Sequence, residues 1–140
     1  MDKIKKIIVS TDGGSRSNPG QAAAAFVIQN EKGDVLVKDG KYLGIATNNQ
    51  AEYWGVKLAL ERLQSDFGNN PLSDIEIKID SQLVVQQLLG NFKVKDPKMK
   101  ILFEEVKKLE GNIGKIHYTY IPRSQNYLAD ALVNSILDNQ

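Results

Sequence analysis

The first third of the chain consists of short hydrophobic runs separated by turn-forming residues. Residues 4–11 form an apolar run that is closed by the Asp-Gly-Gly of residues 12–14, which predicts a buried strand ending in a glycine turn. Residues 22–29 and 35–43 predict two more strands, and the polar segment 30–34 between them predicts a hairpin turn. We therefore expect an antiparallel meander of three strands.

The spacing of apolar residues then changes from that of strands to that of a helix. The Thr-Asn-Asn of residues 47–49 offers capping side chains, and the Gly-Asn-Asn-Pro of residues 68–71 would stop a helix. Between them four apolar residues recur at helical spacing: Ala51, Trp54, Leu58 and Leu63. This pattern predicts a helix to about Phe67, with Glu52 in its first turns.

The rest of the chain alternates strands with helices. We expect, in order, a strand at 75–79, a helix at 82–89, a basic link at 90–96, a helix opened by Pro97, a strand at 115–121 and a helix at about 125–137. In the last two helices the residues expected to face inward are Ile101, Val106 and Leu109, then Leu128, Leu132 and Ile136. The order βββαβααβα predicts an α/β fold with a five-stranded mixed sheet flanked by helices, in which an antiparallel meander joins parallel strands through helical crossovers.

Composition narrows the class of protein. The 140 residues suit one compact domain, 1–140, and 41% hydrophobic beside 25% charged residues is typical of globular proteins. The apolar run at the start is too short for an export signal and no membrane span is indicated, so we expect a cytoplasmic protein. The chain has 18 basic and 17 acidic residues, so its net charge is only +1. Nucleic-acid binding would therefore depend on local charges rather than on a general basic field.

The available residues restrict metal chemistry to oxygen ligands. The chain has no cysteine and a single histidine, His117, which excludes thiolate and multi-histidine sites. Asp12 and Asp80 follow predicted strands, and Glu52 and Asp130 lie on predicted helices. If those strands are adjacent and parallel, the four carboxylates converge, and their repulsion calls for cations such as Mg²⁺ or Mn²⁺. Two such ions about 4 Å apart suit in-line cleavage of a phosphodiester.

Each of these residues also has a simpler structural explanation. Asp12 could be a turn former, Asp80 a helix N-cap, and Glu52 and Asp130 exposed acids of their helices. His117 on an alternating strand is more typical of a packed or edge side chain than of a catalytic base. Taken singly, none of the acids indicates an enzyme.

Four segments taken together resemble the motifs of type 1 ribonuclease H in order and spacing. They are residues 11–20, 47–52, 79–84 and 126–132. The resemblance implies the ribonuclease H-like fold and cleavage of the RNA strand of an RNA–DNA hybrid, with 5′-phosphate and 3′-hydroxyl product ends. It also implies that two Mg²⁺ ions, or Mn²⁺ as a substitute, are ligated by four catalytic residues, namely Asp12, Glu52, Asp80 and Asp130. Asp12 would bridge both ions.

The resemblance further implies contacts with the hybrid. The residues at the matching positions are Gly13, Gly14, Ser15, Asn18, Thr47, Asn49 and Gln82. Asn18 and Thr47 would hold a phosphate of the DNA strand, whereas Asn49 and Gln82 would contact sugar edges and bases in the minor groove. The backbone of residues 13–15 would meet the 2′-hydroxyls that distinguish RNA from DNA.

The sequence departs from many members of that family in two loops. Residues 90–96 replace a basic helix that serves some members as a handle for the hybrid, and Lys93 and Lys95 would form a reduced handle. The loop before the last helix lacks the histidine found in many members. Arg123 lies there instead, and we expect it to assist product release.

Other classes of protein share parts of this pattern. Transposases, integrases and junction resolvases also place carboxylates around two metal ions, usually with extra domains or dimerisation. A non-catalytic nucleic-acid-binding module and a protein whose metal only stabilises the fold are further alternatives. The presence of all four acids favours a hydrolase, which we expect to be a monomer.

Overall fold

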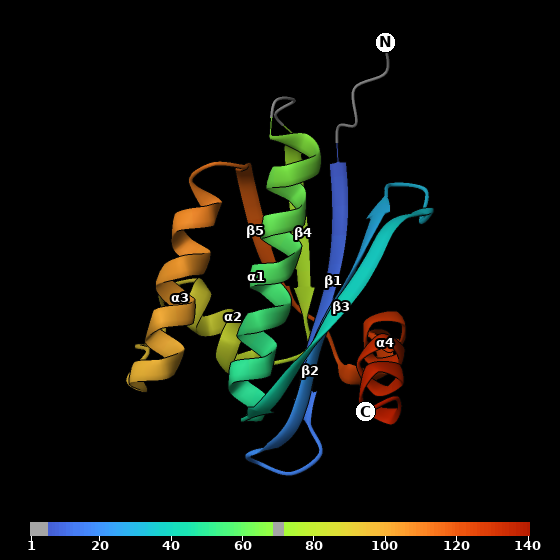
Figure 1. Cartoon of the computed structure of the whole chain (residues 1–140). Coiled ribbons are helices and arrows are strands. Elements are labelled where there is room, and N and C mark those ends of the chain that lie inside the picture. Colours follow the sequence, from blue (N-terminus) through green and yellow to red (C-terminus); the bar gives the residue numbers. More distant parts are fainter. Residues whose placement is uncertain (1–5, 69–71) are drawn as a thin grey trace.

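The computed structural model describes residues 6–68 and 72–140, and its elements follow the predicted order βββαβααβα (Figure 1). The strands are β1 Lys6–Ser15, β2 Gly20–Asn30, β3 Val35–Ala46, β4 Leu72–Ile79 and β5 Gly114–Tyr120. The helices are α1 Asn48–Phe67, α2 Gln82–Leu88, α3 Pro97–Glu110 and α4 Tyr127–Asp138, with a 3₁₀ turn, Arg123–Gln125, before α4. The predicted start of the first strand and most of the predicted stop at 68–71 lie outside the described residues.

The strands form one mixed sheet in the order β3-β2-β1-β4-β5, which confirms the predicted fold class. β1 pairs antiparallel with β2, and β2 with β3, as a meander does. β1 pairs in parallel with β4, and β4 with β5, so helices must make the crossovers. The last parallel pair of β1 and β4 is Thr11 with Ile79, which brings the next residues, Asp12 and Asp80, to the same edge.

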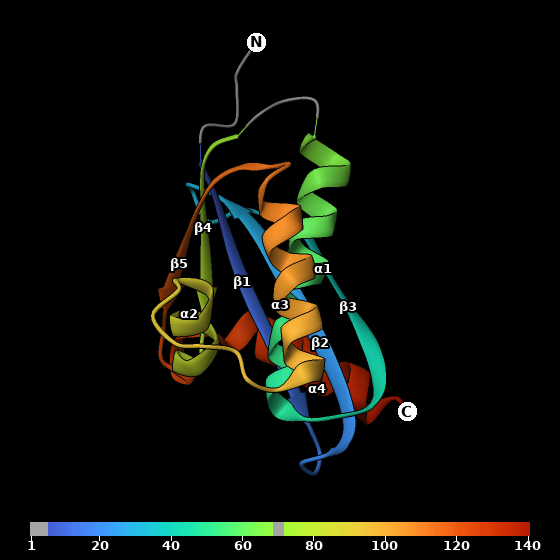
Figure 2. The same cartoon turned by 90° about the vertical axis from the view of Figure 1, so that its left-hand side faces the viewer.

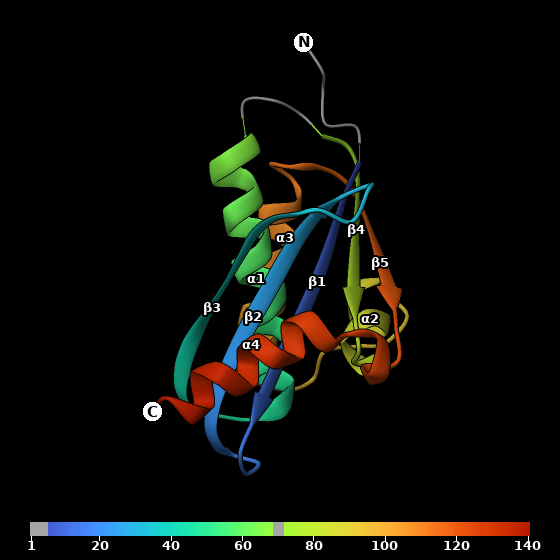
Figure 3. The same cartoon turned by 90° about the vertical axis from the view of Figure 1, so that its right-hand side faces the viewer.

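Helices cover the two faces of the sheet unequally. Helices α1 and α3 lie on one face, and α4 crosses the other face over β2, β1 and β3 (Figures 2 and 3). The larger core lies under α1, where Leu60 and Leu63 pack with the isoleucines of β4. Each such fully buried leucine stabilises the fold by roughly 1.5–3 kcal/mol. A smaller cluster joins Ala23 and Ala25 of β2 to Val133 and Leu137 of α4.

The first strand does not end in the predicted glycine turn. β1 continues to Ser15, and Gly13 pairs with Ala24 of β2. A Cβ on Gly13 would lie 2.1 Å from the carbonyl carbon of Ala51, so this glycine allows α1 to approach the strand. β2 and β3 likewise extend beyond the predicted ranges, because the turn residues 30–34 shape only one end of the hairpin.

Ala51, Leu63 and Val106 are buried as predicted, but several other residues expected to face inward are not the most buried ones of their helices. In α3, Ile101 is 59% exposed, whereas the buried residues are Met99, Leu102 and Val106. In α4 the buried row is Ala129, Val133 and Leu137, and the predicted Leu128, Leu132 and Ile136 are only partly buried beside it. In α1, Trp54 and Leu58 are partly buried, while Tyr53, Val56 and Leu60 are in the core. Apolar residues border both sides of each buried row, so spacing alone could not select the row.

The predicted ends of the shorter helices shift by a residue or two. Leu89 is the C-cap of α2 rather than its last residue, and α4 begins at Tyr127 after the 3₁₀ turn.

Within the described ranges, no helix has the length and hydropathy that crossing a membrane requires.

Candidate active site

The start of α1 fixes Glu52 beside β1. Thr47 caps the helix, because its Oγ1 accepts from the Gln50 backbone N–H at 3.1 Å while Gln50 Oε1 accepts from the Thr47 N–H at 2.8 Å. Glu52 is only 6% exposed, and its Oε1 accepts from the Gly13 N–H at 2.9 Å. Glu52 is therefore not the solvated helix acid of the simpler explanation.

Asp12 and Asp80 meet Glu52 because their strands are adjacent and parallel. One carboxylate oxygen from each of Asp12, Glu52 and Asp80 lies within 4.8 Å of the other two. Asp80 is not the cap of α2, since the Ser81 side chain accepts from the Val84 N–H there. Three acids far apart in the sequence thus converge at one edge of the sheet.

Burial and convergence disfavour the charged forms of Asp12 and Glu52. Burial raises the pKa of Asp12 from 3.8 to about 7, and the nearby Asp80 carboxylate adds to the increase. Burial and the Asp12 carboxylate also raise the pKa of Glu52. Glu52 Oε2 is buried and has no hydrogen-bond partner among the described residues. A hard divalent cation such as Mg²⁺ fits this donor set, because it would neutralise the repulsion and be bound entirely by oxygen.

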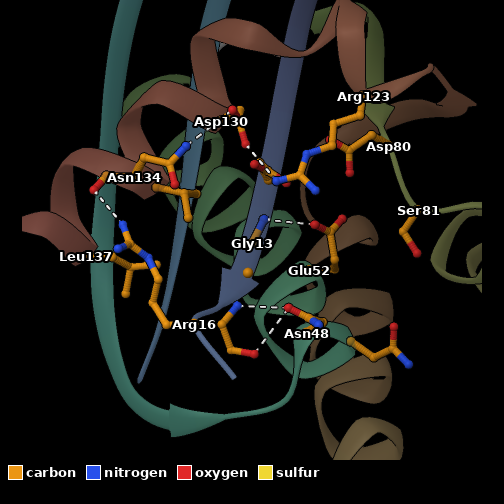
Figure 4. Close-up of a pocket in the computed structure, with 15 residues that line it drawn as sticks. Gly13, Arg16, Asn48, Glu52, Asp80, Ser81, Arg123, Asp130, Asn134 and Leu137 are labelled. Carbon is orange, nitrogen blue, oxygen red and sulfur yellow. Dashed lines mark hydrogen bonds and ion pairs between the residues drawn. The ribbon is translucent and has the colours of Figure 1, made fainter. Parts of the chain in front are cut away.

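Asp130, on α4, lines the same cleft as the three clustered acids. A cleft of about 540 Å³ is lined by all four predicted acids, yet Asp130 is not in the cluster of three (Figure 4). Its Oδ1 accepts from Arg123 Nη2 at 3.3 Å and its Oδ2 from Asn134 Nδ2 at 3.3 Å. The fourth acid therefore lines the cleft, while its carboxylate is bound by Arg123 and Asn134 and is not part of the cluster of three.

The residues expected to contact the hybrid fall into two groups. Gly13, Gly14, Ser15 and Asn49 line the cleft. Three others are not among the described lining residues: Asn18, Thr47 and Gln82. Asn18 Oδ1 accepts from the backbone N–H of Asn48 at 3.1 Å, and Gln82 Oε1 accepts from Gln86 at 3.2 Å. Their predicted contacts with nucleic acid stay predictions.

His117 lies on the edge strand β5, as the simpler explanation expected. Its Nε2 is 3.2 Å from Asp74 Oδ1, and its side chain is 50% exposed. His117 is not among the described residues that line the cleft, so it has no place in the site.

Asn126 contacts the site residue Asp80, a role that the sequence did not predict. It is 1% exposed, and its Nδ2 donates both to the Thr11 carbonyl at 2.8 Å and to Asp80 Oδ2 at 3.0 Å. This amide ties the start of α4 to the ends of β1 and β4. A polar residue at the first turn of an otherwise apolar helix was the available signal, but it equally indicates an N-cap.

Replacing Asn126 with alanine is expected to lower the free energy of unfolding by about 1–3 kcal/mol, because the buried Thr11 carbonyl loses its donor. Urea denaturation measures the change. Asn91→Ala is the matched control, since the Asn91 amide donates to the exposed Gln86 side chain. Equal losses in both variants would show that the Asn126 bonds add nothing specific.

The raised pKa of Asp12 predicts an unusual pH dependence of the metal-free protein. An unfolded Asp12 ionises near 3.8 but the folded one near 7, so stability is lost as pH rises through that interval. Asp12→Asn is therefore expected to stabilise the metal-free protein at pH 8 by on the order of 2 kcal/mol, and by little at pH 4. Thermal denaturation in EDTA at both pH values tests this. A metal-free variant no more stable than wild type at pH 8 would contradict it.

Comparisons with known proteins agree with this fold. A family model described as reverse transcriptase-like matches residues 10–136. Ribonuclease HI of Halobacterium salinarum is 41% identical over 138 residues, which is 99% of this chain and 67% of that protein. A bifunctional protein of Mycobacterium tuberculosis is 35% identical over 134 residues, but the match spans only 36% of its length.

Solved structures of ribonuclease H1 enzymes superpose on this chain over nearly its whole length. A ribonuclease H1 named LC11, solved in complex with an RNA/DNA hybrid, superposes with a TM-score of 0.89 at 39% identity, covering 92% of this chain and 94% of that one. The H. salinarum ribonuclease H1 structure superposes with a TM-score of 0.88 at 38% identity, covering 96% and 99%.

The mixed sheet and the carboxylates that follow the last β1–β4 residue pair define an enzyme of the ribonuclease H-like class. Within that class, the matches that cover nearly the whole chain include the ribonuclease HI sequence and the ribonuclease H1 structure of H. salinarum. The chain belongs to the type 1 ribonuclease H family.

Proposed function

We propose that this enzyme hydrolyses the RNA strand of RNA–DNA hybrids with two divalent metal ions, Mg²⁺ or Mn²⁺. The observation that carries the proposal is the approach of Asp12, Glu52 and Asp80 to within 4.8 Å of one another beside Asp130. The related LC11 enzyme was crystallised with such a hybrid, which supports the choice of substrate. Because the net charge is only +1, recognition of the hybrid would depend on local contacts in and beside the cleft rather than on a general basic field.

Asp12, Glu52, Asp80 and Asp130 would act as the metal ligands. When bound, the two ions would supply an activated water and stabilise the leaving oxygen. Asp12 and Glu52 must lose their protons to bind a metal ion. Their raised pKa values oppose this loss until a cation is present. Water attack on phosphorus breaks the P–O3′ bond and the 3′ oxygen gains a proton, so the products carry 5′-phosphate and 3′-hydroxyl ends.

The remaining residues of the cleft would orient the substrate. The backbone of Gly13–Ser15 lines the cleft, where it can meet 2′-hydroxyl groups, and Asn49 lies beside it. Arg123 is 80% exposed and bound to Asp130, from which it can reach the departing product. Asn18, Thr47 and Gln82 would contact the hybrid outside the cleft. The enzyme is proposed to act as a single-domain cytoplasmic monomer.

A gel assay with 5′-labelled RNA tests the proposal. We expect Mg²⁺-dependent cleavage of the RNA in hybrid form, no cleavage in EDTA, and little cleavage of the same RNA as a single strand or duplex. Comigration with a 3′-hydroxyl ladder identifies the product ends. Preferential cleavage of duplex DNA or four-way junctions would instead indicate a resolvase, and metal-induced stabilisation without cleavage would indicate a structural metal.

A further inference from the structure

Arg16 follows β1 and is held by its backbone at the edge of the cleft. Its N–H donates to the Gln21 carbonyl at 2.8 Å. The preceding Ser15 donates through its N–H at 2.9 Å and its Oγ at 3.2 Å to Asn48 Oδ1. The main chain at Arg16 is therefore fixed to β2 and α1, while its side chain extends across the cleft toward α4 (Figure 4).

The guanidinium group of Arg16 has only exposed partners. Its Nη2 lies 2.6 Å from Asp138 Oδ1 and 3.4 Å from the Asn134 carbonyl oxygen. The side chains of Arg16 and Asp138 are 48% and 64% exposed. Ion pairs as exposed as this one contribute little to stability, so the guanidinium can leave Asp138 at low cost.

Arg16 differs in this respect from the other cation of the cleft. Arg16 and Arg123 are the two basic residues among the described residues that line it. Arg123 is bound to Asp130, one of the predicted metal ligands, whereas Asp138 is not among the described lining residues. In Figure 4 the two arginines lie on opposite sides of the Gly13–Glu52 contact. Asp138, the ion-pair partner of Arg16, is thus outside the catalytic machinery.

We propose that Arg16 binds a backbone phosphate of the nucleic-acid strand in the cleft, and that Asp138 competes with this phosphate in the free enzyme. The planar guanidinium matches two phosphate oxygens, which makes arginine well suited to such a contact. With a net charge of +1, the chain has few other means of attracting a polyanion to this wall. The inference rests on the proposed function, because it assumes a nucleic-acid strand in the cleft.

The two partners of the ion pair are expected to respond in opposite directions. Arg16→Ala should raise KM for the hybrid about fivefold with kcat within about twofold, and should reduce the slope of log Kd against log salt by about 0.9, the loss of one phosphate contact. Asp138→Asn should lower KM about twofold, because it removes the competitor. Arg62→Ala is the control, since Arg62 pairs with Asp39 and Asp66 away from the cleft.

Fluorescence anisotropy with a labelled hybrid in Ca²⁺, together with steady-state cleavage in Mg²⁺, measures these effects. If both variants shift KM and Kd in the same direction, or the salt dependence of Arg16→Ala is unchanged, the pair only ties the loop to α4 and the proposal is wrong. If wild type binds the hybrid but does not cut it, the proposed function fails, while the anisotropy data still decide the role of Arg16.

Discussion

Replacing Asp80 with asparagine is expected to lower kcat for hybrid cleavage at least about 1,000-fold, a loss of roughly 4 kcal/mol of transition-state stabilisation. One Asp80 oxygen belongs to the cluster with Asp12 and Glu52, and Asp80 Oδ2 accepts from Asn126 Nδ2 at 3.0 Å. The substitution preserves the shape of the side chain and removes its charge. The fold is expected to persist, because an asparagine oxygen can accept the same hydrogen bond.

Asp74→Asn provides a matched control for this prediction. Asp74 lies on the same strand, β4, and pairs with His117 instead of lining the cleft. Steady-state kinetics with a hybrid substrate compares the variants, and calorimetry measures metal binding to each. An Asp80→Asn enzyme that keeps more than about a tenth of wild-type kcat would remove the acid from the proposed chemistry.

The sequence predicted the part of this structure that depends on local pattern and on connectivity. The meander and the crossover helices follow from periodicity and turn residues, whereas the parallel pairing of β1 with β4 was the condition on which the site hypothesis depended, and the structure meets it. Once that pairing holds, acids that directly follow its last residue pair, Thr11 with Ile79, must be neighbours. This is why Asp12 and Asp80 could be placed together although 68 positions separate their numbers in the sequence.

The parts that could not be predicted depend on contacts between elements. Asn126 is followed by a helix, and nothing in its neighbourhood reveals that its amide joins β1 to Asp80. Asp130 matched a family motif, yet its pairing with Arg123 and Asn134 is a property of packed side chains. Ile101 shows the same limit for the core. The row of α3 that is buried depends on how α3 packs against α1, and the sequence of α3 alone does not contain this information.

The site also illustrates a conflict between stability and chemistry. Burial of Asp12 and Glu52 destabilises their charged forms, and a protein built only for stability would place apolar residues there. The surrounding structure supports the cluster through backbone contacts, chiefly the Gly13 N–H to Glu52. The geometry of this one glycine is therefore expected to control both folding and activity.

Replacing Gly13 with alanine is expected to lower the free energy of unfolding by about 3 kcal/mol or more and to abolish measurable hybrid cleavage. The new Cβ would lie 2.1 Å from the carbonyl carbon and oxygen of Ala51 and 2.6 Å from the Glu52 nitrogen. These are backbone atoms of α1, so the whole start of the helix must move. That movement would carry Glu52 away from Asp12 and break the bond that orients it.

Gly14→Ala distinguishes this steric effect from a general intolerance of alanine in β1. The nearest atom to a Cβ on Gly14 is Asn48 Oδ1 at 3.9 Å, an ordinary contact distance, so its stability is expected to stay within about 1 kcal/mol of wild type. Urea denaturation of both variants, with Mg²⁺ absent, gives the comparison. The two glycines are adjacent in one strand. An equal loss of stability in the two variants would therefore show that the loss does not come from the approach of α1 to Gly13.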